Sequence, residues 1–164
     1  SRGLGDVYKR QIFYFGDKYS KPMNCSVDSK DGKKIFVKMG SYGIGVSRLV
    51  AAIIEAKFSN EKMKWPREVS PFDVVIIPVI NKNDNSNVQK AKILYKSLIE
   101  KGIDVLFDDI DENISNKFKK HDLIGIPYQI IVGSETTKDK FEFKEVGKET
   151  QVLEINKIIN LLKK

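Results

Sequence analysis

The chain has 164 residues, of which 41% are hydrophobic and 31% charged, so it can bury a core and is not a disordered chain. No apolar stretch approaches the roughly 20 residues that a membrane-spanning helix needs, and the first residues lack the pattern of a signal peptide. We therefore expect a soluble intracellular protein with no membrane partner. The single cysteine, Cys25, and the single histidine, His121, exclude a disulfide framework and the common zinc sites, so we expect no protein-held metal.

The net charge of +7 is distributed unevenly along the chain. Residues 1–69 carry 14 basic and 7 acidic side chains, whereas residues 70–164 carry 15 of each. All of the excess positive charge therefore lies in the first part. A nucleic-acid surface in the second part has to be a local patch rather than a general basic character.

The first part reads as strands followed by a helix. Residues 12–15 and 33–39 are aromatic and β-branched runs, each ended by glycine, and the Asp/Gly/Ser chemistry of residues 28–33 predicts a tight turn between them. We expect an antiparallel hairpin or meander here. A glycine-rich loop over residues 39–45 then leads into a helix that begins at Val46.

The second part alternates strands and helices. Apolar runs predict strands at residues 72–80, 104–107 and 128–132, and helical spacing predicts helices at residues 87–101 and 115–123 between them. A half-buried strand over residues 141–146 and an amphipathic helix over residues 152–162 follow. The βαβαβ order predicts a small α/β domain with a mixed sheet flanked by helices, and we place its boundary at residue 70.

The glycine-rich segment Met39-Gly-Ser-Tyr-Gly-Ile-Gly-Val-Ser-Arg48 is the most informative local feature. Its spacing is neither that of a dinucleotide-binding loop nor that of a P-loop. Arg48 falls on the first turn of the following helix, where a guanidinium can stack on a base or bind a phosphate in a bidentate manner. The alternative is close packing of helix and strand with a solvated arginine.

These residues resemble motif 3 of class II aminoacyl-tRNA synthetases, in the form of the bacterial prolyl enzymes. Upstream, Ile12-Phe-Tyr-Phe-Gly-Asp-Lys-Tyr-Ser20 is similar to a strand of the family's catalytic domain. Downstream, Trp65-Pro66, Asp108-Asp109 and Leu123-Ile-Gly-Ile-Pro127 are similar to its anticodon-binding domain. The resemblance runs from residue 12 to the end of the chain.

The resemblance implies a role for each matching residue of motif 3. Arg48 is expected to contact ATP and to stabilise charge on the triphosphate, which makes it the catalytic residue, and Gly43 and Gly45 are expected to line the same ATP site. Gly40 and Ser41 are expected beside the proline pocket, where the bacterial enzymes often carry a cysteine in place of serine. Magnesium would enter with ATP rather than on protein ligands.

A second set of candidate residues lies on the predicted helix 115–123 and before it. Lysines and an aromatic residue suit the backbone and the splayed bases of an RNA loop, and carboxylates can accept hydrogen bonds from guanine. The alternatives are a solvated lysine face, a phenylalanine in the core, and acidic residues that only form a turn. His121 is expected on the surface. The candidate tRNA-binding residues are Asp108, Asp109, Lys117, Phe118, Lys119 and Lys120.

The expected organisation has three parts. Residues 1–11 do not resemble the family and are expected to be a non-native tail, residues 12–69 the end of a class II antiparallel catalytic domain, and residues 70–164 the anticodon-binding domain. By resemblance, the parent protein is a cytoplasmic homodimer that activates proline with ATP and transfers it to tRNA(Pro). This chain is expected to be an inactive C-terminal fragment. The alternative function is a non-enzymatic accessory module that binds tRNA.

Overall fold

The computed structural model of the chain describes residues 10–81 and 84–163. The chain divides into two compact units between Glu55 and Ala56. Within the described residues, no helix combines the length and the apolar character needed to cross a membrane. The fold class is α/β, as the sequence predicts: small antiparallel sheets come first and a five-stranded mixed sheet with helices follows.

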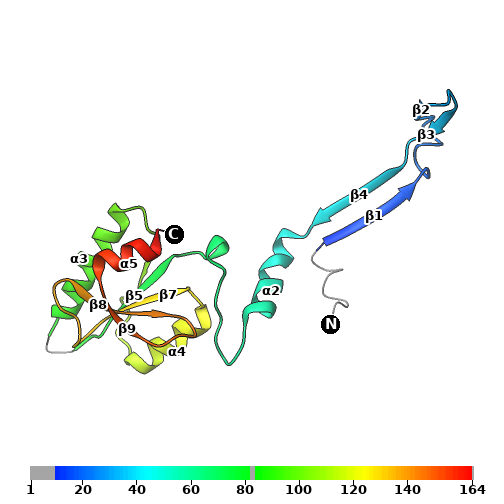
Figure 1. Ribbon diagram of the computed structural model, residues 1–164. Coiled ribbons are helices and arrows are strands. Elements are labelled where there is room, and N and C mark those ends of the chain that lie inside the picture. Colours follow the sequence, from blue (N-terminus) through cyan, green and yellow to red (C-terminus); the bar gives the residue numbers. More distant parts are fainter. Residues whose placement is uncertain (1–9, 82–83, 164) are drawn as a thin grey trace. The chain divides into compact units, whose positions relative to one another are not determined.

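The first unit holds two separate two-stranded antiparallel sheets. One pairs β1 (Arg10–Gly16) with β4 (Met39–Ile44), and the other pairs β2 (Ser26–Asp28) with β3 (Lys34–Phe36). The long hairpin of β1 and β4 and the short sheet at its end are blue to cyan in Figure 1. Helix α2 (Val46–Lys57) begins directly after β4, where the sequence predicts a helix.

The glycine-rich segment is a strand, which corrects the prediction of a loop. Gly40, Ser41 and Gly43 lie in β4 opposite Tyr14, Phe13 and Gln11 of β1. In the run at residues 33–39, which was the predicted partner of β1, residues 34–36 instead form β3 and pair with β2 around the predicted turn. Only Met39 of this run pairs with β1. Short side chains alternating with larger ones fit a paired strand as well as a loop, so composition alone could not separate the two.

The predicted non-native tail lies partly outside the described residues, which begin at residue 10. Arg10 and Gln11, the last two residues of that segment, open β1 opposite Ile44 and Gly43. The backbone at these two positions is therefore part of the hairpin.

The second unit is built on a mixed sheet whose strand order is β6-β5-β7-β8-β9. Strands β6, β5 and β7 run parallel, whereas β8 and β9 are antiparallel to their neighbours. The βαβαβ prediction is confirmed. The strands are β5 (Val74–Pro78), β6 (Val105–Phe107), β7 (Tyr128–Val132), β8 (Lys140–Glu145) and β9 (Gln151–Glu154), and the helices are α3 (Ser86–Glu100), α4 (Ile114–Ile124) and α5 (Ile155–Leu162).

The helices cover opposite faces of this sheet (Figure 1). Helices α3 and α5 bury the larger core, which includes Val74, Ile130 and Phe143, and α4 covers a smaller cluster around Val75, Ile77 and Ile126. Residues 74–77 are therefore buried on both faces, which explains the continuous apolar run in β5.

The start of the predicted final helix is a strand instead. Residues 151–154 form β9, in which Leu153 pairs with Phe141 and Gln151 with Phe143 of β8. The helix follows as α5, beginning at Ile155. The first turn of the expected helix is therefore an edge strand, because its backbone forms hydrogen bonds with β8.

Residues 59–66, which we call the Met63 strap, attach to the C-terminal end of α4. The Met63 amide donates to the Asp122 carbonyl at 2.8 Å, and the Trp65 amide donates to the Gly125 carbonyl at 2.9 Å. The Met63 side chain is buried, and Gly125 has φ +81°, where an added Cβ would lie 2.6 Å from the Met63 Cγ. The strap therefore belongs to the second unit, and the division between the units falls before the predicted boundary at residue 70.

Candidate nucleic-acid interface

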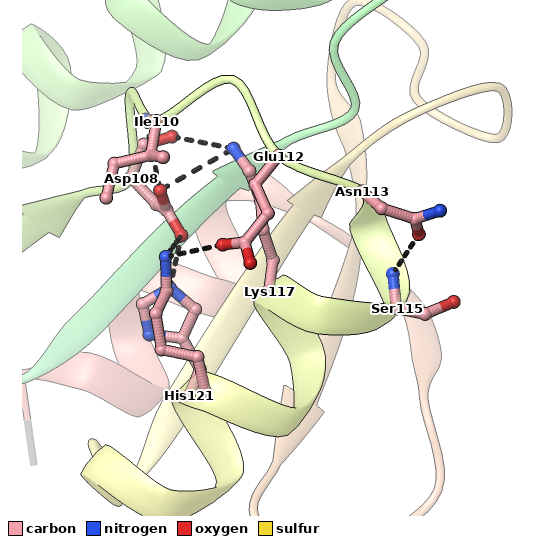
Figure 2. A network of polar contacts seen from close by, with 8 residues as sticks. Asp108, Ile110, Glu112, Asn113, Ser115, Lys117 and His121 are labelled. Carbon is pink, nitrogen blue, oxygen red and sulfur yellow. Dashed lines mark hydrogen bonds and ion pairs between the residues drawn. The ribbon is translucent and has the colours of Figure 1, made fainter.

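Asp108 follows β6 at the carboxyl edge of the parallel strands and is the centre of a buried polar network (Figure 2). Its Oδ2 lies 2.6 Å from His121 Nε2 and 3.0 Å from Lys120 Nζ. Its Oδ1 accepts from the Ile110 amide at 3.2 Å and lies 3.5 Å from Lys117 Nζ. Helical spacing puts residues 117, 120 and 121 on one face of α4, so three side chains converge on one carboxylate.

Burial and charge act against each other in this network. Burial, the largest influence on Asp108, raises its pKa, but hydrogen bonds from His121 and Lys120 and the charge of Lys117 outweigh it, so the pKa falls below the usual value. For His121, burial is again the largest influence and lowers the pKa despite the partner carboxylate. We therefore take His121 as neutral at pH 7, with Nε2–H donating to Asp108.

The structure corrects the predicted surface positions on α4. His121 is 2% exposed rather than on the surface, and Lys117 is 0% exposed, so the three lysines do not form one solvated patch. Lys119 is exposed, and Lys120 is partly buried between Asp108 and Glu112. Only part of the predicted basic patch is thus available to a ligand.

The two adjacent carboxylates have different environments. Asp109 is exposed, whereas Asp108 is 5% exposed and has partners on both oxygens. The contact from the Ile110 amide agrees with the turn-forming alternative for Asp108. Asp109 is therefore the member of the pair whose carboxylate is accessible at the surface.

The position of Phe118 agrees with the alternative of a phenylalanine in the core. Its ring packs against the small core cluster of Val75, Ile77 and Ile126, and it also lines a cavity of about 460 Å³. The Lys144 ammonium lies over the ring, 5.9 Å from its centroid, and pairs with the Asp122 carboxylate at 3.2 Å. The ring therefore contacts the core, a cation and the cavity.

This cavity lies beyond the carboxyl ends of β5 and β7, where open α/β sheets bind ligands. Its lining includes amides, hydroxyls, one ammonium and two carboxylates. Burial, and secondly the charge of Glu135, raises the pKa of the Glu142 carboxyl in this lining. The polar residues that line it are Asn81, Asp84, Asn87, Lys90, Ser134, Thr136 and Glu142.

Glu142 and Lys144 were missed as candidate residues by the sequence analysis. They alternate along β8 with Phe141 and Phe143, whose side chains belong to the larger core. The intervening side chains must therefore point to the α4 face of the sheet. That alternation was visible in the sequence, but the pairing of β8 with β7 was needed to bring the two residues beside Phe118.

The motif 3 residues of the first unit have the order that the resemblance implies. Gly40, Ser41 and Gly43 lie in β4, and the Gly45 carbonyl accepts from the Arg48 amide at 3.0 Å as α2 begins. The Arg48 side chain is exposed and contacts the position that a Gly45 Cβ would occupy, at 3.4 Å from its Cδ. A side chain at residue 45 would therefore crowd the arginine.

Comparisons with known proteins agree with this architecture. The model of the anticodon binding domain family matches residues 73–164. Proline–tRNA ligase of Pelagibacter ubique is 57% identical over 92% of this chain, and that of Wolbachia pipientis wMel is 50% identical over 78%. The alignments cover 34% and 29% of those proteins, so the chain spans about a third of the length of these relatives.

The fold also matches a solved structure, that of Giardia lamblia prolyl-tRNA synthetase in complex with prolyl-adenylate. The TM-score is 0.69 at 23% sequence identity, covering 92% of this chain and 32% of the other. At that identity the likeness concerns the fold. The chain therefore belongs to the anticodon binding domain family. About nine-tenths of the chain also aligns with the proline–tRNA ligase of Pelagibacter ubique.

Proposed function

We propose that the second unit of this chain binds the anticodon loop of tRNA(Pro), as part of a proline–tRNA ligase. The observation that carries the proposal is the cavity at the strand ends, which the Phe118 ring and the Glu142 carboxyl line together. A base can stack on the ring while polar groups read its edge. Asp109 and Lys119 are exposed on the adjoining loop and helix, where they can contact the loop and its phosphates.

The proposal is tested by the affinity of the chain for an RNA stem-loop with a proline anticodon and for the same stem-loop with an altered anticodon. Phe118→Leu keeps an apolar side chain but removes the stacking face, so we expect affinity for the proline stem-loop to fall by about tenfold or more. Measuring at two salt concentrations separates base recognition from attraction to phosphates.

Phe58→Leu is the matched control, because Phe58 is an exposed aromatic residue outside this cavity. It should leave both affinities unchanged. Equal, salt-sensitive binding of the unaltered chain to both stem-loops would overturn the proposal. It would mean that this surface binds polyanions without recognising the anticodon.

We propose in addition that the first unit contributes to the ATP and proline sites of the parent enzyme. Arg48 would contact ATP beside Gly43 and Gly45, and Gly40 and Ser41 would lie near proline, with Mg²⁺ carried by ATP. The exposed guanidinium on the first turn of α2 supports this role, because a cation placed there can stabilise charge on a triphosphate.

Arg48→Ala, placed in a full-length enzyme that contains this segment, should weaken ATP use and leave tRNA binding nearly unchanged. Proline-dependent exchange between ATP and pyrophosphate measures the first, and a filter-binding assay measures the second. Equal loss of both would contradict the assignment.

A further inference from the structure

Asp108 has no free position for an RNA base. Both carboxylate oxygens have partners, and its main-chain carbonyl accepts from Lys117 Nζ at 3.2 Å. Lys117 is 0% exposed, so it cannot reach a ligand on the surface. These two residues are therefore excluded as direct contacts, although the sequence places them among the candidates.

The network joins two segments that are separate in the sequence and adjacent at the interface. Asp108 and Ile110 belong to the loop after β6, which also carries the exposed Asp109, whereas Lys117 and His121 belong to α4, which carries Phe118 and Lys119 (Figure 2). One carboxylate thus fixes the position of the loop relative to the helix. Each segment also carries an exposed charged side chain, Asp109 on the loop and Lys119 on the helix.

We propose that Asp108 and Lys117 are positioning residues for anticodon recognition, which hold the loop of residues 109–113 and helix α4 in the arrangement that the RNA requires. The inference rests on the proposed function of this surface. The carboxylates of Asp108 and Glu112 balance the ammonium groups of Lys117 and Lys120, so this network has no net charge. Removing the Asp108 charge leaves the buried Lys117 ammonium without a carboxylate partner, which is strongly unfavourable.

A positioning role and a simple charge effect predict opposite changes in RNA affinity for the Asp108→Asn variant. Asp108→Asn makes the chain more positive by one unit, so attraction to RNA phosphates should increase slightly. A positioning role instead predicts that affinity for the proline stem-loop falls while affinity for the altered stem-loop does not. The ratio of the two affinities is therefore the measurement that decides.

The experiment compares the unaltered chain with Asp108→Asn, Lys117→Met and the double variant, each at a temperature where circular dichroism shows it folded. We expect each single variant to lower the affinity ratio by about tenfold, the size expected for a lost hydrogen bond to a charged group. The double variant should lower the ratio no further, because both substitutions remove the same interaction between Asp108 and Lys117. Glu100→Gln, which removes an exposed carboxylate from α3, should leave the ratio unchanged.

The other outcomes overturn the inference in distinguishable ways. If Asp108→Asn lowers the ratio and Lys117→Met does not, Asp108 contacts the RNA directly. If the folded variants all keep the original ratio, the network serves stability alone. If a single variant does not fold, the double variant decides, since it leaves no buried ammonium at residue 117. If the unaltered chain does not discriminate, the proposed function fails and this inference fails with it.

Discussion

His121 shows how a single residue can be misjudged from its neighbours in sequence. It stands among lysines on a polar helix, which is typical of a surface position. In the structure it turns inward because Asp108 lies at the end of the adjacent strand and accepts from its ring. The partner is 13 residues away and on another element, so local pattern could not reveal the pair.

Burial of His121 should make the stability of the second unit depend on pH. Its Nδ1 has no hydrogen-bond partner among the described groups. Burial lowers the pKa of His121 most; Asp108 raises it, and the charges of Lys120 and Lys117 lower it further. The folded pKa therefore lies below the ordinary value of 6.5. Between the folded and unfolded pKa values the unfolded chain binds more protons, so stability is full above pH 6.5 and falls as the pH falls.

His121→Gln tests this dependence, because its amide can still donate to Asp108 but takes up no proton. Urea unfolding at pH 7 and pH 5 should show a smaller loss of stability in the variant than in the unaltered chain. The acidic residues titrate in both proteins, so the difference between them isolates His121. Equal losses would mean that the pKa of His121 is the same in the folded and unfolded chains, and would contradict the lowered pKa.

Glycines of similar conformation differ in what surrounds them. Gly125 and Gly147 have φ of +81° and +85°, where L-residues are strained, but only Gly125 has atoms in the place of a Cβ. Those atoms include the Met63 carbonyl at 2.7 Å. The first glycine therefore permits the strap to dock, whereas the second only permits a turn.

At the level of elements, the sequence predicts the parallel strands well because each is a short apolar run between clear breaks. Val74–Pro78 and Tyr128–Val132 are buried on both faces, so nearly every residue carries the signal. β4 and β9 carry little signal of this kind. Their residues are mostly exposed, and their strand character comes from pairing with β1 and β8.

Helix α4 was predicted close to its bounds, but its inward face was not. Apolar spacing identifies Ile114 and Phe118, which pack on the smaller core. Lys117 and His121 are also buried, and no hydrophobic pattern marks them. The candidate site was therefore predictable as a region, while the division into buried network and exposed surface required the fold.

In the molecule as a whole, the apolar core is confined to one unit. Among the residues that the structure describes, every buried hydrophobic side chain lies at or after Met63. The first unit instead exposes Ile12, Tyr14 and Tyr42 on a two-stranded sheet, and isolated sheets of this size are marginally stable. We therefore expect the second unit to fold by itself.

The boundary of that unit can be tested with two fragments, residues 56–164 and residues 70–164. The shorter fragment begins at the boundary predicted from sequence and lacks the Met63 strap. Removing the strap exposes the surface that buries Met63 and leaves the Asp122 and Gly125 carbonyls without their amide donors. It also removes the hydrogen bond from the Trp65 indole to the Ile124 carbonyl.

Burying a methionine contributes about 1.5–3 kcal/mol, and each hydrogen bond adds about 0.5–1.5 kcal/mol. We therefore expect the fragment of residues 70–164 to be less stable by roughly 3 kcal/mol, with the same type of cooperative transition. Urea unfolding followed by circular dichroism measures the difference. Equal stability of the two fragments would place the boundary at residue 70 and make the strap a linker. A lower midpoint for the shorter fragment would show that the stability of the second unit depends on residues before that boundary.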